Sequence, residues 1–581
     1  MRRSAVVTLL SVLVVGAATA IAPGAAGATP TATRSAEARA QASGAKQYVV
    51  LYKSAGGSAA GRAAIVAAGG SVVSENTEVG YAIVRSDRTS FSTDVSRSTA
   101  VEGAAADRVI GYAPKEQRAQ SLRRNDIERL TADRAARAKA GKVAAGQADA
   151  AAVPVDEPLA NRQWDMRQIG ATPGGSYGVQ PGKPTVRVGI IDTGIDGTHP
   201  DIAANFDAAD SHNFVTDLPV IDGPCEYPSC IDPVDHDDDG HGTHVASTVA
   251  SPINGLGTAG VAPGVTLVNL RAGQDSGFFF LAPTLQAISY AGDIGVDVIN
   301  MSFFTDPWLY NCVSNPADSP AEQSEQRVIR ETTQRALNYA RRHGVLPVAA
   351  LGNEFTDLGD PTVDTTSPDY PEGTAKVRTV DNSCITVPTE SKGVVSVSST
   401  GPSTRMSYFS NYGTEQNDVA APGGDAYDSP DETLDPRNLV LAAYPKNVAE
   451  ANGDLNPDGT PNNDFVVRDC LASTCAYYQY LQGTSMASPH AVGVAALIVS
   501  QYGHSDAAHG GLTLAPATTE RILKRTAVDH ACPQPRAFTW VRHRPDGSVA
   551  TATATCTGPT SKNGFYGNGI VNAYAAVTGS H

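Results

Sequence analysis

Short apolar runs alternate with helix-compatible stretches in the first part of the chain. The runs are rich in Val, Ile and Tyr, which favour strands. The order of runs is β-α-β-β-α-β, typical of a small two-layer α+β, ferredoxin-like domain, which we place at 29–112. The predicted strands are 47–53, 71–76 and 79–85, a last apolar stretch ends near Ile110, and helices are expected near 58–68 and 88–98.

The pattern changes from about residue 155, where continuous apolar runs alternate with longer helical stretches. Such runs indicate strands that are buried on both faces, as in a doubly wound, mostly parallel α/β sheet. In this architecture the functional groups gather at the carboxyl ends of the strands. The runs are Val186–Asp192, Val265–Arg271, Val296–Ser302, Val345–Asn353 and Val394–Ser399, and the long polar insertions between elements are 216–239, 305–325, 355–383 and 424–470.

The N-terminus has the features of a secretory signal. Arg2 and Arg3 precede an apolar run from Ala5 to Ala22, and Ala26-Gly27-Ala28 fits a cleavage site, so we predict a signal peptide at 1–28. The alternative is a membrane anchor, which the short, Ala-rich run disfavours. We therefore expect a secreted protein with no membrane association after signal removal.

Charge separates the chain into two parts. The first 150 residues carry 20 Lys+Arg and 12 Asp+Glu, whereas the whole chain has 44 and 60 and a formal charge of −16. The body is therefore strongly acidic and would repel phosphates, which excludes nucleic acid as a partner. The segment 113–154 is basic, and we interpret it as a solvated helix or linker, with maturation cleavage near 145–157.

All eight cysteines lie at or beyond position 225. An even number in an exported chain indicates disulfides rather than zinc, since no Cys-x-x-Cys occurs. Eight cysteines allow on the order of a hundred pairings, so spacing does not fix the connectivity. We expect Cys225–Cys230, Cys470–Cys475, Cys312–Cys384 and Cys532–Cys556.

Three segments carry candidate chemistry. Asp192 closes an apolar strand before a glycine turn, His241 and His244 lie in Asp239-Gly240-His241-Gly242-Thr243-His244, and Ser485 opens an apolar helix in Gly483-Thr484-Ser485-Met486-Ala487. A serine needs an adjacent base to act as a nucleophile, and histidine held by a buried aspartate is such a base. Taken singly, the aspartate could be a turn residue, the serine an N-cap, and the two histidines a metal site.

Together these segments resemble the subtilisin-type serine endopeptidases (subtilases). The resemblance implies that Asp192 orients, His241 is the base, Ser485 is the nucleophile and Asn353, in Gly352-Asn353, donates to the oxyanion. It covers nearly the whole chain: the small N-terminal domain resembles an inhibitory propeptide, and Gly567–Ala573 resembles the end of the catalytic domain, 155–581. Serine-elbow esterases fit less well, because Ala487 replaces their last glycine.

The resemblance also implies a substrate cleft. Substrate backbone would pair with the stretches around Gly277 and Ser302, and the primary pocket would lie between Ser302-Phe303-Phe304 and Ala350–Asn353, including Gly352. Phe304 stands where the family usually has glycine. We hypothesise a narrowed pocket with restricted specificity; the alternative is that both rings point into the core.

Calcium is the cofactor that the resemblance implies. The expected ligands are Asp201, Asn254 and the carbonyls of Pro252, Leu256 and Thr258, and hard oxygen ligands suit Ca²⁺. A second candidate is the acidic loop containing Asp232, Asp235, Asp237, Asp238 and Asp239. The alternative for that loop is a solvated acidic surface.

The sequence therefore predicts a secreted, monomeric serine endopeptidase that is made as an autoinhibited precursor. It would cleave protein or peptide substrates through an acyl-enzyme, with its own propeptide as intramolecular inhibitor. The rival interpretation is a catalytically silent relative that acts as a secreted binding protein.

Overall fold

The computed structural model describes residues 46–107, 126–130, 157–371 and 373–579. The predicted signal peptide 1–28 and most of the predicted linker 113–154 lie outside the described residues. No described helix is both long and apolar enough to cross a membrane.

The N-terminal part forms a four-stranded antiparallel sheet with two helices, as the βαββαβ pattern predicts. The strand order is β2-β3-β1-β4. Side chains alternate along the first strand: Tyr48, Val50 and Tyr52 pack with Ile65 and Phe91 on the helical face, because successive strand residues point to opposite faces. The elements are β1 (Lys46–Tyr52), α2 (Ser58–Ala67), β2 (Ser71–Asn76), β3 (Tyr81–Ser86), α3 (Phe91–Val95) and β4 (Val101–Asp107).

The larger part is built on a seven-stranded parallel sheet of order β13-β12-β9-β8-β5-β7-β6. The five predicted strands are all present, which confirms the doubly wound α/β class. The sequence pattern missed the two edge strands, which are short. The bounds are β5 (Arg187–Ile191), β6 (His212–Asn213), β7 (Thr266–Arg271), β8 (Val298–Met301), β9 (Leu346–Ala350), β12 (Val395–Thr400) and β13 (Val419–Pro422).

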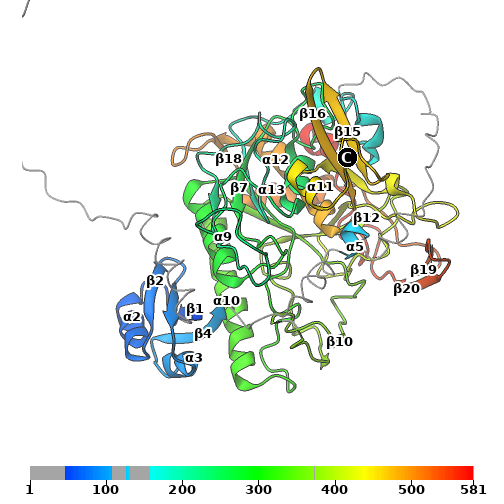
Figure 1. Cartoon of the computed structure of the whole chain (residues 1–581). Coiled ribbons are helices and arrows are strands. Elements are labelled where there is room, and N and C mark those ends of the chain that lie inside the picture. The colour runs from blue at the N-terminus through cyan, green and yellow to red at the C-terminus, as the bar shows by residue number, and fades with distance from the viewer. Residues whose placement is uncertain (1–45, 108–125, 131–156, 372, 580–581) are drawn as a thin grey trace, which may run out of the picture. The chain divides into compact units, whose positions relative to one another are not determined.

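Helices cover both faces of this sheet. On one face α8 (His241–Ala250) and α12 (Thr484–Tyr502) pack on Val188 and Ile190 of β5. On the other face α9 (Leu281–Ile294) and α10 (Pro320–Arg342) lie side by side (Figure 1) and pack with Ile191. Apolar residues on both faces of one strand explain why the runs in the sequence are continuous rather than alternating.

The remaining elements are short and decorate this framework. They include a three-stranded antiparallel sheet of order β14-β16-β15, which packs on the apolar core of the larger part. The bounds are α5 (Asp126–Arg129), η2 (Ala160–Arg162), α7 (Trp164–Gln168), η3 (Ser176–Gly178), β10 (Val363–Asp364), β11 (Arg378–Thr379), η4 (Pro436–Asn438), β14 (Val440–Ala443), α11 (Lys446–Ala451), β15 (Val466–Leu471), β16 (Thr474–Leu481), β17 (His504–Ser505), β18 (Leu512–Thr513), α13 (Pro516–Thr526), β19 (Ala537–His543), β20 (Val549–Thr555) and α14 (Ala573–Thr578).

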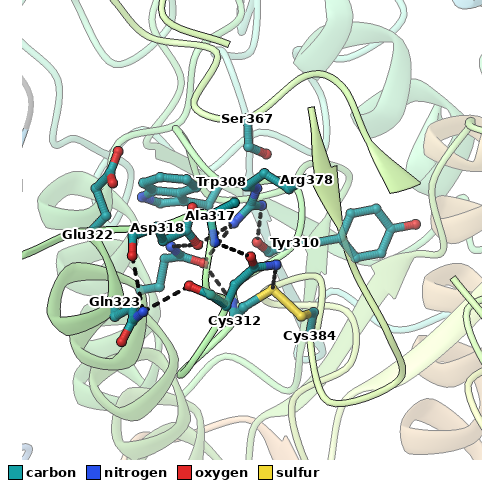
Figure 2. Close-up of polar contacts among 12 residues, drawn as sticks. Trp308, Tyr310, Cys312, Ala317, Asp318, Glu322, Gln323, Ser367, Arg378 and Cys384 are labelled. Atoms are coloured by element: carbon teal, nitrogen blue, oxygen red, sulfur yellow. Dashed lines mark hydrogen bonds and ion pairs between the residues drawn. A yellow bond between two sulfur atoms is a disulfide. The ribbon is translucent and has the colours of Figure 1, made fainter. Parts of the chain in front are cut away.

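Disulfides and buried ion pairs hold the insertions in place. All four expected disulfides, including Cys312–Cys384, are present. Figure 2 shows the environment of Cys312–Cys384, where fully buried Arg378 donates to Asp318 Oδ2 (2.8 Å). Arg378 also donates to Asp364 Oδ2 (2.6 Å). The Arg378 guanidinium also lies over the ring of Trp308, 4.8 Å from its centroid. These contacts join the insertions that follow β8 and β9, the two strands that lead into the predicted substrate pocket.

Candidate active site

Four predicted site residues follow directly from the strand and helix ends. Asp192 comes after β5, Asn353 follows β9, His241 is the first residue of α8, and Ser485 is the second residue of α12. Parallel strands end at one edge of the sheet, so the topology brings these side chains together from distant parts of the sequence.

Close backbone packing sets the distance between Asp192 and His241. A Cβ atom at Gly242 would lie 2.1 Å from the carbonyl oxygen of Gly194 and 3.0 Å from the Cβ of Asp192. Only glycine therefore lets the first turn of α8 approach the loop after β5. The Gly242 N–H donates to Thr193 Oγ1 (3.0 Å), which fixes the contact.

Asp192 and His241 form a buried pair. His241 Nδ1 lies 2.7 Å from Asp192 Oδ1, and the Thr193 N–H donates to the same oxygen (2.8 Å). This geometry places the proton on Nδ1 and leaves Nε2 for exchange with a nucleophile. The His241 N–H donates to Asp239 Oδ1 (3.0 Å), which anchors the start of α8.

The charges around the two histidines of this motif differ. Burial by itself lowers the pKa of His241, but the nearby carboxylates of Asp192 and Glu128 outweigh burial and raise the pKa to about 10. Burial lowers the pKa of His244 to about 3, and its Nε2 faces the carbonyls of Val440 and Gln479. His244 is therefore a neutral packing residue of α8, and it does not pair with His241 as a metal site.

Asn353 is oriented by the residue before Ser485. Its Oδ1 accepts hydrogen bonds from the N–H and the hydroxyl of Thr484, both at 2.9 Å. Because the oxygen is occupied, the Nδ2 donors must point to the other side, where the side chain of Ser485 lies. Ser302 supports the same region, since its hydroxyl donates to the Ser485 carbonyl (3.0 Å).

A residue that the sequence analysis did not select occupies the centre of the site. Glu128, in α5, accepts from Ser485 Oγ (2.6 Å) and from Asn353 Nδ2 (3.2 Å) through Oε1, and its Oε2 lies 3.4 Å from His241 Nε2. Residues 126–130 belong to the segment expected to be a solvated linker, yet Glu128 and Leu130 are buried. The only local signal is Ile127 and Leu130, two large aliphatic residues three positions apart in a segment poor in them.

The predicted substrate residues lie in several environments. Ala350 is the last residue of β9. Gly352 follows this strand, and its N–H donates to Thr484 Oγ1 (3.0 Å), next to Ser485. Gly277 lies in a turn after β7, with φ +82° and its N–H on the Gln274 carbonyl (2.8 Å).

The two phenylalanines after Ser302 are half-buried and pack against apolar clusters. Phe303 stacks on Phe279 with ring centroids 4.1 Å apart, and Phe304 packs on a cluster that includes Leu351. This packing supports the alternative that the rings point toward the core, and it leaves pocket narrowing as a hypothesis.

The residues predicted to bind calcium come together, but as a hydrogen-bonded loop. Asp201 Oδ1 accepts from Asn254 Nδ2 (3.2 Å), and Oδ2 accepts from the Thr258 N–H (3.1 Å). Asn254 Oδ1 accepts from the Leu256 N–H (2.9 Å), and Pro252 is buried in the same loop. Burial raises the pKa of Asp201 well above its ordinary value. Protein donors take the side-chain oxygens of Asp201 and Asn254 in this loop, and calcium binding here stays a prediction.

A different acidic cluster could hold a metal ion. Carboxylate oxygens of Asp217, Glu226 and Asp232 lie within 4.8 Å of one another, as do those of Glu226, Asp238 and Asp275. Asp217 Oδ2 and Asp232 Oδ1 are buried and accept no hydrogen bond among the described residues. Arg271, paired with Asp217, Asp232 and Asp275, supplies one positive charge to this group. Carboxylates outnumber the one arginine here, and two of them, Asp217 and Asp232, are buried, which fits an oxygen-ligated cation.

The other members of the predicted acidic loop have structural partners. Asp237 accepts from the N–H groups of Gly240 (2.9 Å) and Thr243 (3.0 Å) and so shapes the turn before α8. Asp239 pairs with Arg129 at 2.8 Å. Asp235 accepts the Gly197 N–H through its backbone carbonyl (3.1 Å). Of the five residues proposed for the second calcium site, only Asp232 and Asp238 lie in the metal-compatible groups.

Known proteins with similar sequences include serine proteinases. The thermophilic serine proteinase of Bacillus sp. (strain AK1) is 28% identical over 56% of this chain and 55% of its own length, so the chain aligns with about half of that relative. Subtilisin DY of Bacillus licheniformis is 28% identical over 55% of this chain and 77% of its own length.

Solved structures show the same fold. The epidermin leader peptide processing serine protease of Staphylococcus aureus superposes with a TM-score of 0.57 at 22% identity, covering 92% of this chain and 98% of that chain. Fervidolysin of Fervidobacterium pennivorans gives a TM-score of 0.53 at 19% identity, covering 92% of this chain and 61% of its own.

The family model described as the subtilase family matches residues 183–569, a range that contains Asp192, His241, Asn353 and Ser485. The chain therefore belongs to the subtilase family.

Proposed function

We propose that this protein is a secreted serine endopeptidase that hydrolyses peptide bonds through an acyl-enzyme. The observation that carries the proposal is the convergence of Asp192, His241, Asn353 and Ser485 at one edge of the sheet, with the Asp192–His241 hydrogen bond formed at 2.7 Å. The printed descriptions of the relatives as serine proteinases, and the family match, support it.

The proposed chemistry gives each of these side chains a distinct role. With Glu128 absent, His241 Nε2 accepts the proton of Ser485 Oγ as the oxygen attacks the substrate carbonyl carbon. Asn353 Nδ2 and the Ser485 N–H donate to the oxyanion. The imidazolium then protonates the leaving amine as the C–N bond breaks. His241 then takes a proton from water as the water oxygen attacks the acyl carbon. The imidazolium gives this proton to Ser485 Oγ as the acyl C–O bond breaks, which releases the acid product and restores the serine hydroxyl.

We propose that the β1–β4 domain acts as the propeptide of a precursor. Asp107 Oδ1 accepts the N–H of Ala282 in the first turn of α9 (2.9 Å), and Arg335 of α10 donates to the Tyr52 carbonyl (2.9 Å). These contacts support an intramolecular partner that docks on the catalytic domain. The four disulfides support an oxidising, extracellular destination.

Two rivals make different predictions for one experiment. Wild type and Ser485→Ala would be purified in parallel, and their masses and digestion of casein compared. Loss of about 150 N-terminal residues and casein digestion by wild type alone support the proposal. A silent binding protein would show neither change, and an esterase would turn over ester but not peptide substrates. Wild type that stays inert and resists fluorophosphonate labelling even after removal of the segment before residue 157 would overturn the proposal.

We also propose that Ca²⁺ is bound, and we place it at Asp217, Glu226 and Asp232 rather than at Asp201. Bound calcium would offset the negative charge of the acidic insertion. It would also connect Glu226, which lies in the Cys225–Cys230 loop, with the two aspartates that pair with Arg271. Its role would be structural, because none of these carboxylates is in contact with Ser485 or His241 in the described hydrogen bonds. Removal of calcium should therefore change stability before it changes the chemistry of the site.

A further inference from the structure

The Glu128 carboxylate lies in the oxyanion hole, which must be unoccupied for a substrate to react. Its Oε1 accepts from both Ser485 Oγ (2.6 Å) and Asn353 Nδ2 (3.2 Å), so it occupies the position at which a substrate oxyanion would be stabilised. The hydroxyl of Ser485 has one proton, and that proton is directed to Glu128 instead of to His241. The nucleophile is therefore disconnected from its base.

The base is blocked by the same carboxylate. Glu128 Oε2 lies 3.4 Å from His241 Nε2, the nitrogen that would accept the serine proton. A carboxylate at Nε2 together with Asp192 at Nδ1 favours the doubly protonated imidazolium. An imidazolium cannot act as a base, so both halves of the Ser485–His241 couple are held in an unreactive state.

Neighbouring contacts hold the segment in place. Arg129 donates to Asp239 Oδ1 (2.8 Å) and to the Asp239 carbonyl (2.7 Å) beside His241. Leu130 is buried in the main apolar core of the catalytic domain. Two ion pairs therefore hold the segment: Glu128 with His241, and Arg129 with Asp239. Each of the four side chains is exposed to solvent by only about a tenth or less.

The segment does not lie as a substrate. Residues 126–129 form a helical turn, and the carbonyls of Ile127 and Glu128 accept hydrogen bonds from Gln482 (2.9 and 3.2 Å). The group facing Ser485 is the side-chain carboxyl group of Glu128, which is a poor electrophile, and not a peptide carbonyl. The turn can therefore fill the site without being cut there.

We propose that residues 126–130 are an internal plug, in which the Glu128 carboxylate holds the precursor inactive and the Arg129–Asp239 pair anchors it. This rests on the proposed endopeptidase function and adds the residue and the chemistry of its regulation. Activation then requires cleavage outside 126–130 and departure of the plug.

The test measures how fast a fluorophosphonate probe labels the full-length band before any cleavage. We expect the Glu128→Ala precursor to label at least tenfold faster than wild type, and Arg129→Ala to show a smaller increase. Glu102→Gln, a propeptide carboxylate paired with exposed Lys53, is the matched control and should behave as wild type. Equal labelling of wild-type and Glu128→Ala full-length bands would overturn the plug.

A second measurement does not depend on how the variants fold. A synthetic peptide of residues 123–133 is added to the processed wild-type enzyme, and a Glu128→Gln version serves as its control. We expect inhibition by the native peptide and at least tenfold weaker inhibition by the variant; equal inhibition overturns the plug. If neither the precursor nor the processed wild type reacts with the probe, the endopeptidase function itself is wrong. Failure of that function is thus distinguished from failure of the plug alone.

Discussion

His241 Nδ1 and Asp192 Oδ1 lie 2.7 Å apart, although the two residues are 49 positions apart in the chain. The contact depends on the end of β5, on the start of α8, and on the absence of a side chain at Gly242. It fixes one ring nitrogen and so determines which nitrogen can serve as the base.

Replacing Asp192 by Asn should lower kcat/KM for a peptide substrate by about 10⁴-fold, because the amide favours the wrong tautomer of His241. Steady-state hydrolysis of a chromogenic peptide by the processed enzyme measures the effect. Asp196→Asn, in the following loop, is the control and should retain activity. A loss of less than tenfold for Asp192→Asn would contradict the assigned role.

Asn353→Leu should lower kcat by about 10²–10³-fold with little change in KM, because the lost Nδ2 donor acts on the transition-state oxyanion. Asn353→Asp also removes the Nδ2 donor, but it keeps an oxygen that accepts from Thr484. This variant therefore separates the positioning of Thr484 from the stabilisation of the oxyanion. Both variants should be equally slow. If the aspartate variant kept wild-type kcat, the oxyanion assignment would be wrong.

The raised pKa of His241 predicts a pH-dependent plug. The carboxylates of Asp192, Glu128 and Asp239 face this imidazole and raise its pKa to about 10. The extra stability of the protonated, plugged state is complete below the ordinary histidine pKa of about 6.5 and is lost as pH rises through about 10. In a Ser485→Ala precursor, the NMR signal of the imidazolium should persist to about pH 10, and Glu128→Gln should lower the midpoint. An unchanged midpoint would show that Glu128 does not act on His241.

Arg378→Met should destabilise the catalytic domain by about 3–5 kcal/mol, because it leaves the buried carboxylates of Asp318 and Asp364 without a counter-charge. Urea unfolding of the inactive Ser485→Ala background avoids self-digestion. Arg437→Ala breaks an exposed pair with Asp435 and should cost about 0–1 kcal/mol. Comparable losses in the two variants would contradict the buried network of Figure 2.

Chelation of calcium should lower the melting temperature of the Ser485→Ala protein. A cation present at about 100 times its Kd contributes about 2.7 kcal/mol to the folded state. Asp217→Asn combined with Asp232→Asn should remove the calcium dependence, whereas Asp201→Asn should retain it. Loss of the dependence in Asp201→Asn alone would return the site to the Asp201 loop.

Sequence alone was sufficient where function depends on local pattern. The apolar runs predicted the N-terminal sheet and five of the seven strands of the parallel sheet, because a buried strand needs apolar residues whatever its neighbours are. The motifs around Asp192, His241 and Ser485 identified the family because each combines a reactive side chain with the glycines that its backbone needs. Short separations favoured disulfides such as Cys225–Cys230, and the structure confirms them.

The tertiary structure decided what depends on partners distant in sequence. Glu128 lies in a segment with weak patterning, and its partner Ser485 is 357 positions away, so no local signal could place it. Asp201 and Asp217 differ in the partners that the fold brings to their oxygens. Asp201 accepts from neutral amide donors, whereas Asp217 lies beside Arg271 and two further carboxylates. A side chain's charge and reactivity follow from those neighbours, and only folding assembles them.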